Sequence, residues 1–392
     1  MLAVLSGVDR IRQWWLPLLA LVLALAGGLL LVRAAGDLER EHVVVGGVPL
    51  DVVRPAGSPP GPGVVVAHGY AGSARLMAQF GDTLAARGWT VVLPDLDGHG
   101  ANQRSPTDLQ YDLDVAVTHL RGLPGVDGSR IALVGHSMGA GAVTAYAAGH
   151  PQIGATVAIS LPGAAPVPKD RPARLLLLTG GLEFPGFRAA ADEAVAGARP
   201  DRRAVVVPGV EHISVLYAPE THRLTADWLG PGDEPLPFPL RRLVASGLLL
   251  LGLLLGFPTV ARLGVGPLTV AYAGAAIAVP LHLGFTHAVP VGVHWWALPS
   301  LWAGFAALGH ACGSLRNDLI GAVLAVVALT TAAAAGVAPG FILLVVPLLG
   351  VLMVIQAGLS AVLRARAAPA WVVALTGSLL VAWPIATTLP LA

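Results

Sequence analysis

The sequence predicts a mixed α/β domain set between membrane-spanning helices. Hydrophobic residues make up 55% of the 392 residues and charged residues only 12%, about half the charged share of an ordinary soluble domain. Long uncharged stretches lie before residue 33 and after residue 242. Between them, short runs of Val, Leu and Ile alternate with helix-length segments, which is typical of a mostly parallel sheet with helices on both faces.

The first uncharged stretch predicts a membrane anchor. Residues 13–32 carry no charge between Arg12 and Arg33, and about 20 apolar residues suffice to cross a bilayer. A cleaved signal peptide is the alternative, but its apolar region usually holds about 7–15 residues. We therefore expect residues 1–40 to form a short cytoplasmic stub and a retained transmembrane helix.

The α/β segment is expected over residues 41–230, followed by a proline-rich linker over 231–240. Strands are predicted at 42–45, 50–54, 63–67, 90–93, 131–134, 155–160, 175–179 and 204–207. Helices are predicted at 74–87, 107–120, 138–149, 188–198 and 214–229. An opening hairpin followed by strand and helix alternation builds one open sheet.

The C-terminal part predicts a six-span membrane domain over residues 241–392. Its uncharged stretches are 243–261, 263–315, 319–363 and 367–392. At about 20 residues per span they hold one, two, two and one helices. With the N-terminal anchor, the total is about seven transmembrane helices.

The arginines in short loops predict the orientation, because Lys and Arg mark the cytoplasmic side. With seven spans, one face collects the arginines at positions 10, 12, 262, 316, 364 and 366. We therefore expect an integral protein of a bacterial plasma membrane. Its N-terminus would be cytoplasmic and its α/β domain extracytoplasmic.

A strand, a glycine-flanked serine and a helix follow one another at Gly135-His136-Ser137-Met138-Gly139. A serine in so sharp a turn projects its hydroxyl clear of the backbone, and the glycines let strand and helix pack closely. The five residues alone are a weak signal in a chain with 48 Gly. The predicted strand before them and helix after them make Ser137 a candidate nucleophile.

Three motifs, each following a predicted strand, resemble those of the α/β-hydrolase superfamily, especially its monoacylglycerol-lipase-like and dienelactone-hydrolase-like members. They are His68-Gly69-Tyr70-Ala71-Gly72, Leu93-Pro94-Asp95-Leu96-Asp97-Gly98-His99-Gly100 and the serine pentapeptide. The resemblance covers residues 41–230 and leaves out the C-terminal spans. It implies the α/β-hydrolase fold, here without a cap domain, because the segment 161–173 is too short to form one.

The resemblance also implies a catalytic triad in the chain order serine, acid, histidine. Ser137 would be the nucleophile, Glu183 the acid after the strand at 175–179, and His212 the base after the last strand. Asp is more usual than Glu at the acid position, so Asp170, after the sixth strand, is the alternative acid.

An oxyanion hole needs two backbone N–H groups that point at the developing negative oxygen. The resemblance places one on Met138 and the other on Tyr70. Asp95, Asp97 and His99 are expected to structure their loop, and His136 to pack and hydrogen-bond within the serine turn.

Composition limits the kinds of molecule and ion that this chain is expected to bind. A net charge of +1 without a Lys/Arg cluster argues against nucleic acid. The single cysteine, Cys312, cannot form an intramolecular disulfide. No metal-ligand spacing stands out, and the histidines at 282, 287, 294 and 310 are expected at membrane interfaces.

We expect a membrane-anchored serine hydrolase that needs no cofactor and cleaves a carboxylic ester through an acyl-enzyme. A lipid or another membrane-partitioned ester is favoured because a helical bundle is fused to the domain. An acyltransferase or a peptidase would use the same triad. A transporter or scaffold with a degenerate hydrolase domain is the alternative from another class. The sequence leaves the oligomeric state open.

Overall fold

The computed structural model describes residues 2–262, 306, 313–335, 342–377 and 380–381, with short gaps at 36–37, 58–60, 71, 103, 105–107, 165–166, 199–200, 231 and 233. The chain divides into two compact units. Ala34–Arg242 belong to one unit, and the long apolar helices before and after this segment belong to the other.

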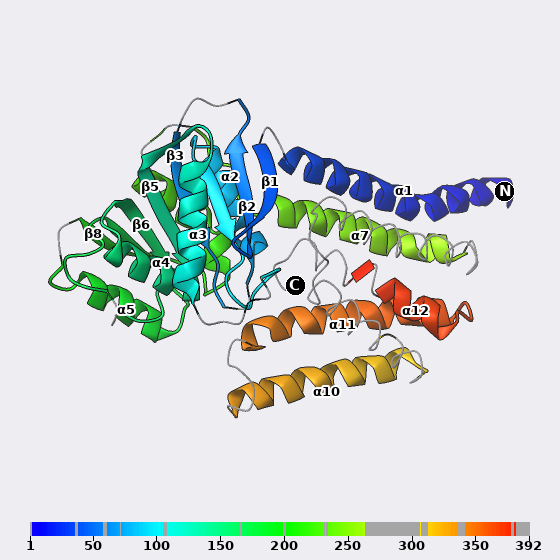
Figure 1. Cartoon of the computed structure of the whole chain (residues 1–392). Coiled ribbons are helices and arrows are strands. Elements are labelled where there is room, and N and C mark those ends of the chain that lie inside the picture. The colour runs from blue at the N-terminus through cyan, green and yellow to red at the C-terminus, as the bar shows by residue number, and fades with distance from the viewer. Residues whose placement is uncertain are drawn as a thin grey trace. The chain divides into compact units, whose positions relative to one another are not determined.

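An eight-stranded sheet forms the centre of the first unit (Figure 1). Its strands are β1 (Leu38–Val45), β2 (Val48–Pro55), β3 (Gly61–Ala67), β4 (Thr90–Pro94), β5 (Val126–His136), β6 (Ile153–Ile159), β7 (Leu175–Gly180) and β8 (Arg202–Val207). Their order is β1-β2-β4-β3-β5-β6-β7-β8. Strand β2 runs antiparallel to β1 and β4, and the other neighbours are parallel. The expected mostly parallel sheet is confirmed.

The central strands are apolar on both faces because helices cover both. Every residue of β7 is buried, and so is β3 after its first residue, as expected for parallel strands between two helical layers. The edge strand β1 has partly and fully exposed positions.

The helices of this unit are α2 (Ala78–Ala85), α3 (Leu109–Gly122), α4 (Met138–Gly149), α5 (Pro185–Val195) and α6 (Pro219–Leu229), with 3-10 turns at Ala74–Met77 and Ser214–Tyr217. Residues of α2 and α6 share one core cluster with Val66 and Val134. Residues of α3 and α4 share another with Val65 and Leu133. Successive residues of a strand point to opposite faces, so the two helix pairs cover opposite faces of the sheet.

Local signals explain where these helices begin. The Asp108 carboxylate accepts hydrogen bonds from the backbone N–H groups of Gln110 and Tyr111, both at 3.1 Å, and so caps α3. Proline occupies the first position of α5 and α6, where its missing N–H costs nothing. The described part of 160–174, between β6 and β7, has no helix or strand.

The apolar helices are α1 (Leu2–Ala35), α7 (Arg241–Arg262), α10 (Leu315–Ala334), α11 (Ile342–Arg364) and the shorter α12 (Ala370–Gly377). Among the described residues, four segments are long and apolar enough to cross a membrane: Trp14–Ala34, Arg241–Thr259, Leu315–Ala332 and Val346–Arg364. They lie where four of the seven expected spans were placed.

The count of seven spans is not confirmed. Nearly all of the stretch 263–315, where two spans are expected, and half of the last expected stretch, 367–392, lie outside the described residues, as do the four histidines and Cys312. Two expected boundaries also move. Helix α1 extends beyond the expected 13–32, and β1 begins at Leu38 rather than after residue 41.

Candidate active site

Ser137 occupies a strained turn between β5 and α4. Its φ of 52° and ψ of −116° lie outside the regions that side chains normally favour. A Cβ on Gly139 would lie 2.6 Å from the carbonyl oxygen of Ala67, and one on Gly135 would lie 2.8 Å from the nitrogen of Ala140. Only glycine fits at both positions, which is the arrangement that the sequence pattern predicts.

The structure brings His212 to Ser137. The Nε2 atom of His212 lies 3.1 Å from Ser137 Oγ, within hydrogen-bond distance. The loop that carries His212 is fixed by Glu211, whose carboxylate accepts the backbone N–H groups of Ile213 at 2.9 Å and Ser214 at 2.6 Å. A base held in this way is positioned to take the serine proton.

Glu183 lies on the other side of the His212 ring. Its Oε1 atom is 3.2 Å from His212 Nδ1, and its side chain is only 1% exposed. The turn after β7 sets this position, since Glu183 N donates to Gly180 O at 3.2 Å. The three predicted side chains thus form one hydrogen-bonded chain, and their catalytic roles remain predictions.

Ser160 is a residue of this site that the sequence reasoning missed. It follows β6, has a φ of 55° and is fully buried. Its hydroxyl donates to the same Glu183 oxygen that faces His212. A lone serine carries no distinctive sequence signal. The available clue was its place after β6, where some superfamily members carry the acid.

Asp170, the alternative acid, is not brought to His212. Its side chain is 70% exposed, and its carboxylate lies 3.6 Å from Arg171 Nε. The geometry therefore favours Glu183 as the carboxylate that can orient His212.

His136 contacts the loop that carries His212. It is buried, its Nε2–H donates to the His212 carbonyl oxygen at 3.0 Å, and the two rings are 4.7 Å apart. Burial is the main cause that lowers the pKa of His136 to about 3, so its ring stays neutral at neutral pH. Its role matches the packing and hydrogen-bonding role expected from the sequence.

The two proposed oxyanion donors belong to segments next to Ser137. Met138 is the first residue of α4, and the first N–H groups of a helix have no partner within the helix. Tyr70 follows Gly69, where an added Cβ would lie 3.1 Å from the Cβ of Ser137. The loop bearing Tyr70 therefore packs directly against the serine turn.

The loop after β4 is held by buried polar groups, as expected. Asp95 accepts the N–H groups of Ala74 at 2.7 Å and Ala101 at 2.8 Å. His68 Nε2 accepts the N–H of Leu96 at 3.0 Å. Desolvation is the main cause that raises the pKa of Asp95 to about 6.

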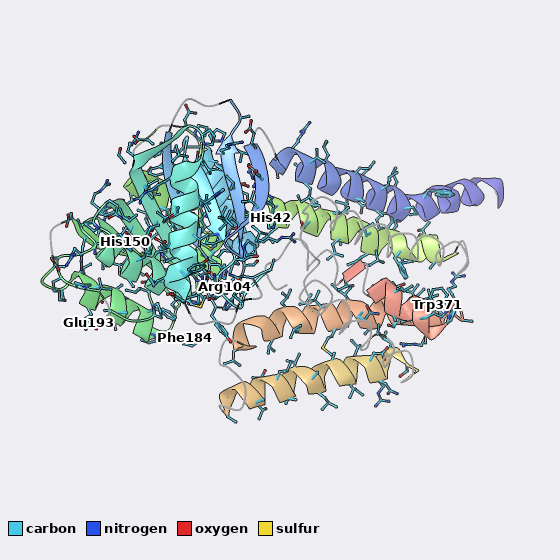
Figure 2. The ribbon with its side chains drawn as sticks, viewed as in Figure 1. His42, Arg104, His150, Phe184, Glu193 and Trp371 are labelled. Atoms are coloured by element: carbon cyan, nitrogen blue, oxygen red, sulfur yellow. The ribbon has the colours of Figure 1, made fainter. Side chains whose placement is uncertain are left out.

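Several apolar side chains belong to the segments that carry the three polar ones. Leu182 and Phe184 flank the acid in sequence and are 69% and 60% exposed, and Tyr70 is 65% exposed. Phe184 directly precedes α5 (Figure 2). The ring of Phe187 lies 4.6 Å from that of His212. Exposed apolar groups beside polar ones are typical of a site that receives an apolar ligand.

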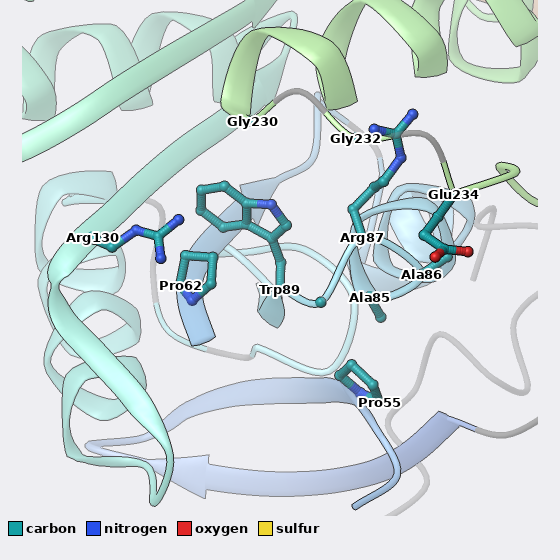
Figure 3. Close-up of a pocket in the computed structure, with 11 residues that line it drawn as sticks. Pro55, Pro62, Ala85, Ala86, Arg87, Trp89, Arg130, Gly230, Gly232 and Glu234 are labelled. Atoms are coloured by element: carbon teal, nitrogen blue, oxygen red, sulfur yellow. The ribbon is translucent and has the colours of Figure 1, made fainter. Parts of the chain in front are cut away.

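A cavity of about 480 Å³ lies elsewhere in this unit (Figure 3). Its lining includes Pro62 near the start of β3, Trp89 directly before β4 and Arg130 within β5, together with Arg87 and Glu234. Ser137, Glu183 and His212 instead follow the carboxyl ends of their strands, so this cavity is not the candidate active site. No group of three or more metal-binding side chains occurs among the described residues.

Comparison with known proteins agrees with the fold. Residues 58–207 match the hydrolase family model described as serine aminopeptidase, S33. An uncharacterized protein of Mycobacterium tuberculosis is 30% identical over 177 residues, which cover 39% of this chain. The chain spans 63% of that relative's length. A second uncharacterized mycobacterial protein, from Mycobacterium bovis, is 35% identical over 101 residues, covering 26% of this chain and 28% of its own.

Among solved structures, a dienelactone hydrolase from Anabaena variabilis is similar, with 21% identity and a TM-score of 0.41, over 49% of this chain and 97% of its own. A membrane phospholipase A, described as a bacterial virulence factor, has 17% identity and a TM-score of 0.42, over 58% and 96%.

Proposed function

We propose that this chain, whose first unit has the α/β-hydrolase fold, is a membrane-anchored serine hydrolase that cleaves carboxylic esters. The observation that carries the proposal is the hydrogen-bonded chain from Ser137 through His212 to Glu183. Serine is a poor nucleophile at neutral pH, and a neighbouring imidazole with a fixed tautomer is what activates it.

The proposed reaction follows from this geometry. Ser137 Oγ attacks the acyl carbonyl while His212 Nε2 takes its proton. His212 then returns the proton to the leaving alcohol, and Glu183 stabilises the imidazolium formed between the two steps. The N–H groups of Met138 and Tyr70 would hold the oxyanion. Water, deprotonated by His212, then releases the acid from the acyl-enzyme.

We expect the acyl group of the substrate to be apolar. The exposed side chains of Tyr70, Leu182 and Phe184 support this assignment, because burying them against an acyl chain removes apolar surface from water. Transfer of the acyl group to another alcohol would use the same acyl-enzyme. A peptidase is the second candidate, favoured by the description of the matching family model.

The test is labelling of the full chain in membranes with a fluorophosphonate probe. Wild type should label, and Ser137→Ala should lose labelling by about 10³-fold or more. Ser129→Ala is the control, because this exposed serine is hydrogen-bonded to Asp127 near the amino end of β5, whereas Ser137 follows the carboxyl end of that strand. Folded wild-type protein that fails to label would contradict the proposal.

Substrate assays then separate the two candidates. A series of p-nitrophenyl esters of rising chain length should be cleaved, with the longer chains preferred. Aminoacyl p-nitroanilides should be cleaved far more slowly. Preferential cleavage of the anilides would establish the peptidase instead.

We also infer that the four apolar segments are inserted in a plasma membrane, with the N-terminus cytoplasmic and the hydrolase unit outside. Their length and composition support insertion, and the arginine distribution supports the orientation. The full chain should remain in the pellet after an alkaline carbonate wash. A cysteine introduced as Ser129→Cys, in a Cys312→Ser background, should react with an impermeant maleimide in intact cells. Reaction only after lysis would reverse the orientation.

A further inference from the structure

Three arginines converge on one buried carboxylate in the first unit. Asp82, on α2, is 2% exposed, and its two oxygens accept from Arg40, Arg241 and Arg242. Arg241 lies 2.6 Å from Oδ2, and Arg242 donates to both oxygens at 3.1 Å. We call these four residues the arginine cluster.

The arginine cluster carries unbalanced positive charge. Three guanidinium groups face one carboxylate, which leaves two positive charges, and guanidinium does not lose its proton in proteins. The acidic neighbours of Arg40 in β1, Glu39 and Glu41, point to the opposite face of the strand by alternation. Glu39 is paired with Arg54 at 2.8 Å.

The exposed side of the cluster is entirely cationic. The side chains of Arg40, Arg241 and Arg242 are 30%, 30% and 34% exposed, whereas the carboxylate between them is inaccessible. Each of the two Asp82 oxygens already accepts two hydrogen bonds, which fills its lone pairs. The remaining guanidinium N–H groups can therefore bind a second anion.

Chain connectivity places the cluster at the ends of two candidate membrane spans. Arg241 and Arg242 are the first residues of the span Arg241–Thr259, and Ala34 is the last residue of Trp14–Ala34. The guanidinium of Arg242 also lies 3.5 Å from the carbonyl oxygen of Ala34. The amino end of α7 adds the positive end of a helix dipole, which further favours an anion.

We propose that the arginine cluster binds the phosphate of an anionic phospholipid headgroup. Where apolar helices end, the anion in highest local concentration is a lipid phosphate, and basic side chains near the surface attract such lipids. The proposal uses the proposed membrane insertion of α1 and α7 but not the hydrolase reaction.

The test is native mass spectrometry of the full chain in detergent, titrated with phosphatidylglycerol or with phosphatidylcholine of the same acyl chains. Wild type should retain phosphatidylglycerol in preference. Arg40→Gln and Arg241→Gln should each weaken phosphatidylglycerol binding about fivefold, the effect of one basic residue near a membrane surface. Binding of phosphatidylcholine should not change.

Arg54→Gln is the matched control, since it removes the same charge from the neighbouring strand β2 without touching Asp82. Arg40→Lys keeps the charge and should keep the preference. The proposal is overturned if Arg54→Gln weakens binding as much as Arg40→Gln, if the glutamine variants bind as wild type does, or if Arg40→Lys loses the preference fully.

Glycerol 3-phosphate serves as the free headgroup. If it displaces phosphatidylglycerol at equal concentration, the cluster binds a soluble anion and the lipid proposal fails. Fluorophosphonate labelling of the variants reports on the fold of the hydrolase unit. Because lipid retention is measured separately, absent labelling in wild type would contradict the proposed reaction and leave the lipid result standing.

Discussion

At the scale of single residues, Ser160 controls how Glu183 is presented to His212. Glutamate has a longer and more mobile side chain than the aspartate usual at this position, so it needs a group that selects one rotamer. The Ser160 hydroxyl supplies that group by donating to the oxygen that faces His212 Nδ1. The second oxygen of Glu183 is buried and has no partner among the described residues, so this carboxylate depends on few contacts.

Replacing Ser160 by alanine should therefore slow the activated serine. A hydrogen bond to a charged group contributes about 1.5–3 kcal/mol, so the rate constant of fluorophosphonate labelling should fall about tenfold to hundredfold. Ser73→Ala is the control, because this buried hydroxyl has no partner in the described part of the chain.

A glycine at position 160 distinguishes the effect of the Ser160 hydroxyl from the effect of the backbone conformation. Ser160→Gly relieves the positive φ of 55° but also removes the hydroxyl. It should lose as much labelling rate as the alanine variant. A glycine variant that labels at the wild-type rate would show that Ser160 matters only through its backbone.

At the scale of elements, the close approach of α4 to the carboxyl end of β3 depends on a backbone contact. A Cβ on Gly139 would meet the backbone of Ala67 and His68, whereas one on Gly141, two residues further along the same helix, would meet nothing within 4 Å.

These two glycines give a matched pair. Gly139→Ala should destabilise the first unit by several kcal/mol, because backbone on both sides must shift. Gly141→Ala should instead stabilise it by about 0.5–1 kcal/mol through helix propensity. Urea midpoints of the full chain, read by pulse proteolysis, measure both. Equal effects of the two substitutions would refute the close approach.

Helices α1 and α7 meet through small residues in the second unit. A Cβ on Gly27 would lie 2.7 Å from the carbonyl oxygen of Ala245, and one on Gly252 would lie 2.7 Å from that of Ala20. Small residues allow such close approach of helix backbones in membranes.

This contact predicts a disulfide cross-link. An added Cβ at Gly256 would lie 3.5 Å from the Cβ of Ala20, within the Cβ separation of disulfides. In a Cys312→Ser background, Ala20→Cys with Gly256→Cys should cross-link on mild oxidation, as seen after proteolysis between the helices. Adding Gly27→Val should abolish the cross-link, and adding Gly28→Val, where nothing lies within 4 Å, should not.

At the scale of the whole molecule, buried titrating groups make the stability of the first unit depend on pH. Desolvation, the largest cause in each case, lowers the pKa of His68 and His222 to about 4 and that of His136 to about 3. Desolvation also raises the pKa of Asp95 and Asp112 to about 6. In the unfolded chain these histidines have a pKa of about 6.5. Above that pH they are neutral in both states, so their burial in the neutral form costs no pH-dependent stability.

Acid should destabilise this unit. Between about pH 6 and 4.5 the unfolded chain binds three protons on these histidines that the folded chain does not, and the folded chain binds two on the aspartates. The difference of one proton corresponds to about 1.4 kcal/mol of stability lost per pH unit as pH falls.

Urea midpoints of the full chain at pH 6.0 and 5.0 measure this slope. In His222→Gln the three histidine protons become two, so the slope should vanish over the same range. Stability that increases as pH falls in the wild type would contradict the assignment of these buried groups.

The sequence by itself determined the elements and the order of the candidate site residues. The signals are local: strand and helix periods, proline and aspartate at helix starts, the glycines around Ser137 and the long uncharged stretches. The eight strands and four apolar helices follow from them. Ser137, Glu183 and His212 were identifiable because each follows a strand within a motif.

Only the tertiary structure decided which side chains meet. Ser160 reaches Glu183 because β6 lies beside β7, and Glu183 rather than Asp170 lies against His212 because of the turn after β7. Asp82 forms ion pairs with Arg40 and Arg241, which lie far apart in the chain. Such pairings depend on strand order and chain path, which set contacts between distant residues and leave no trace in the local pattern of either partner.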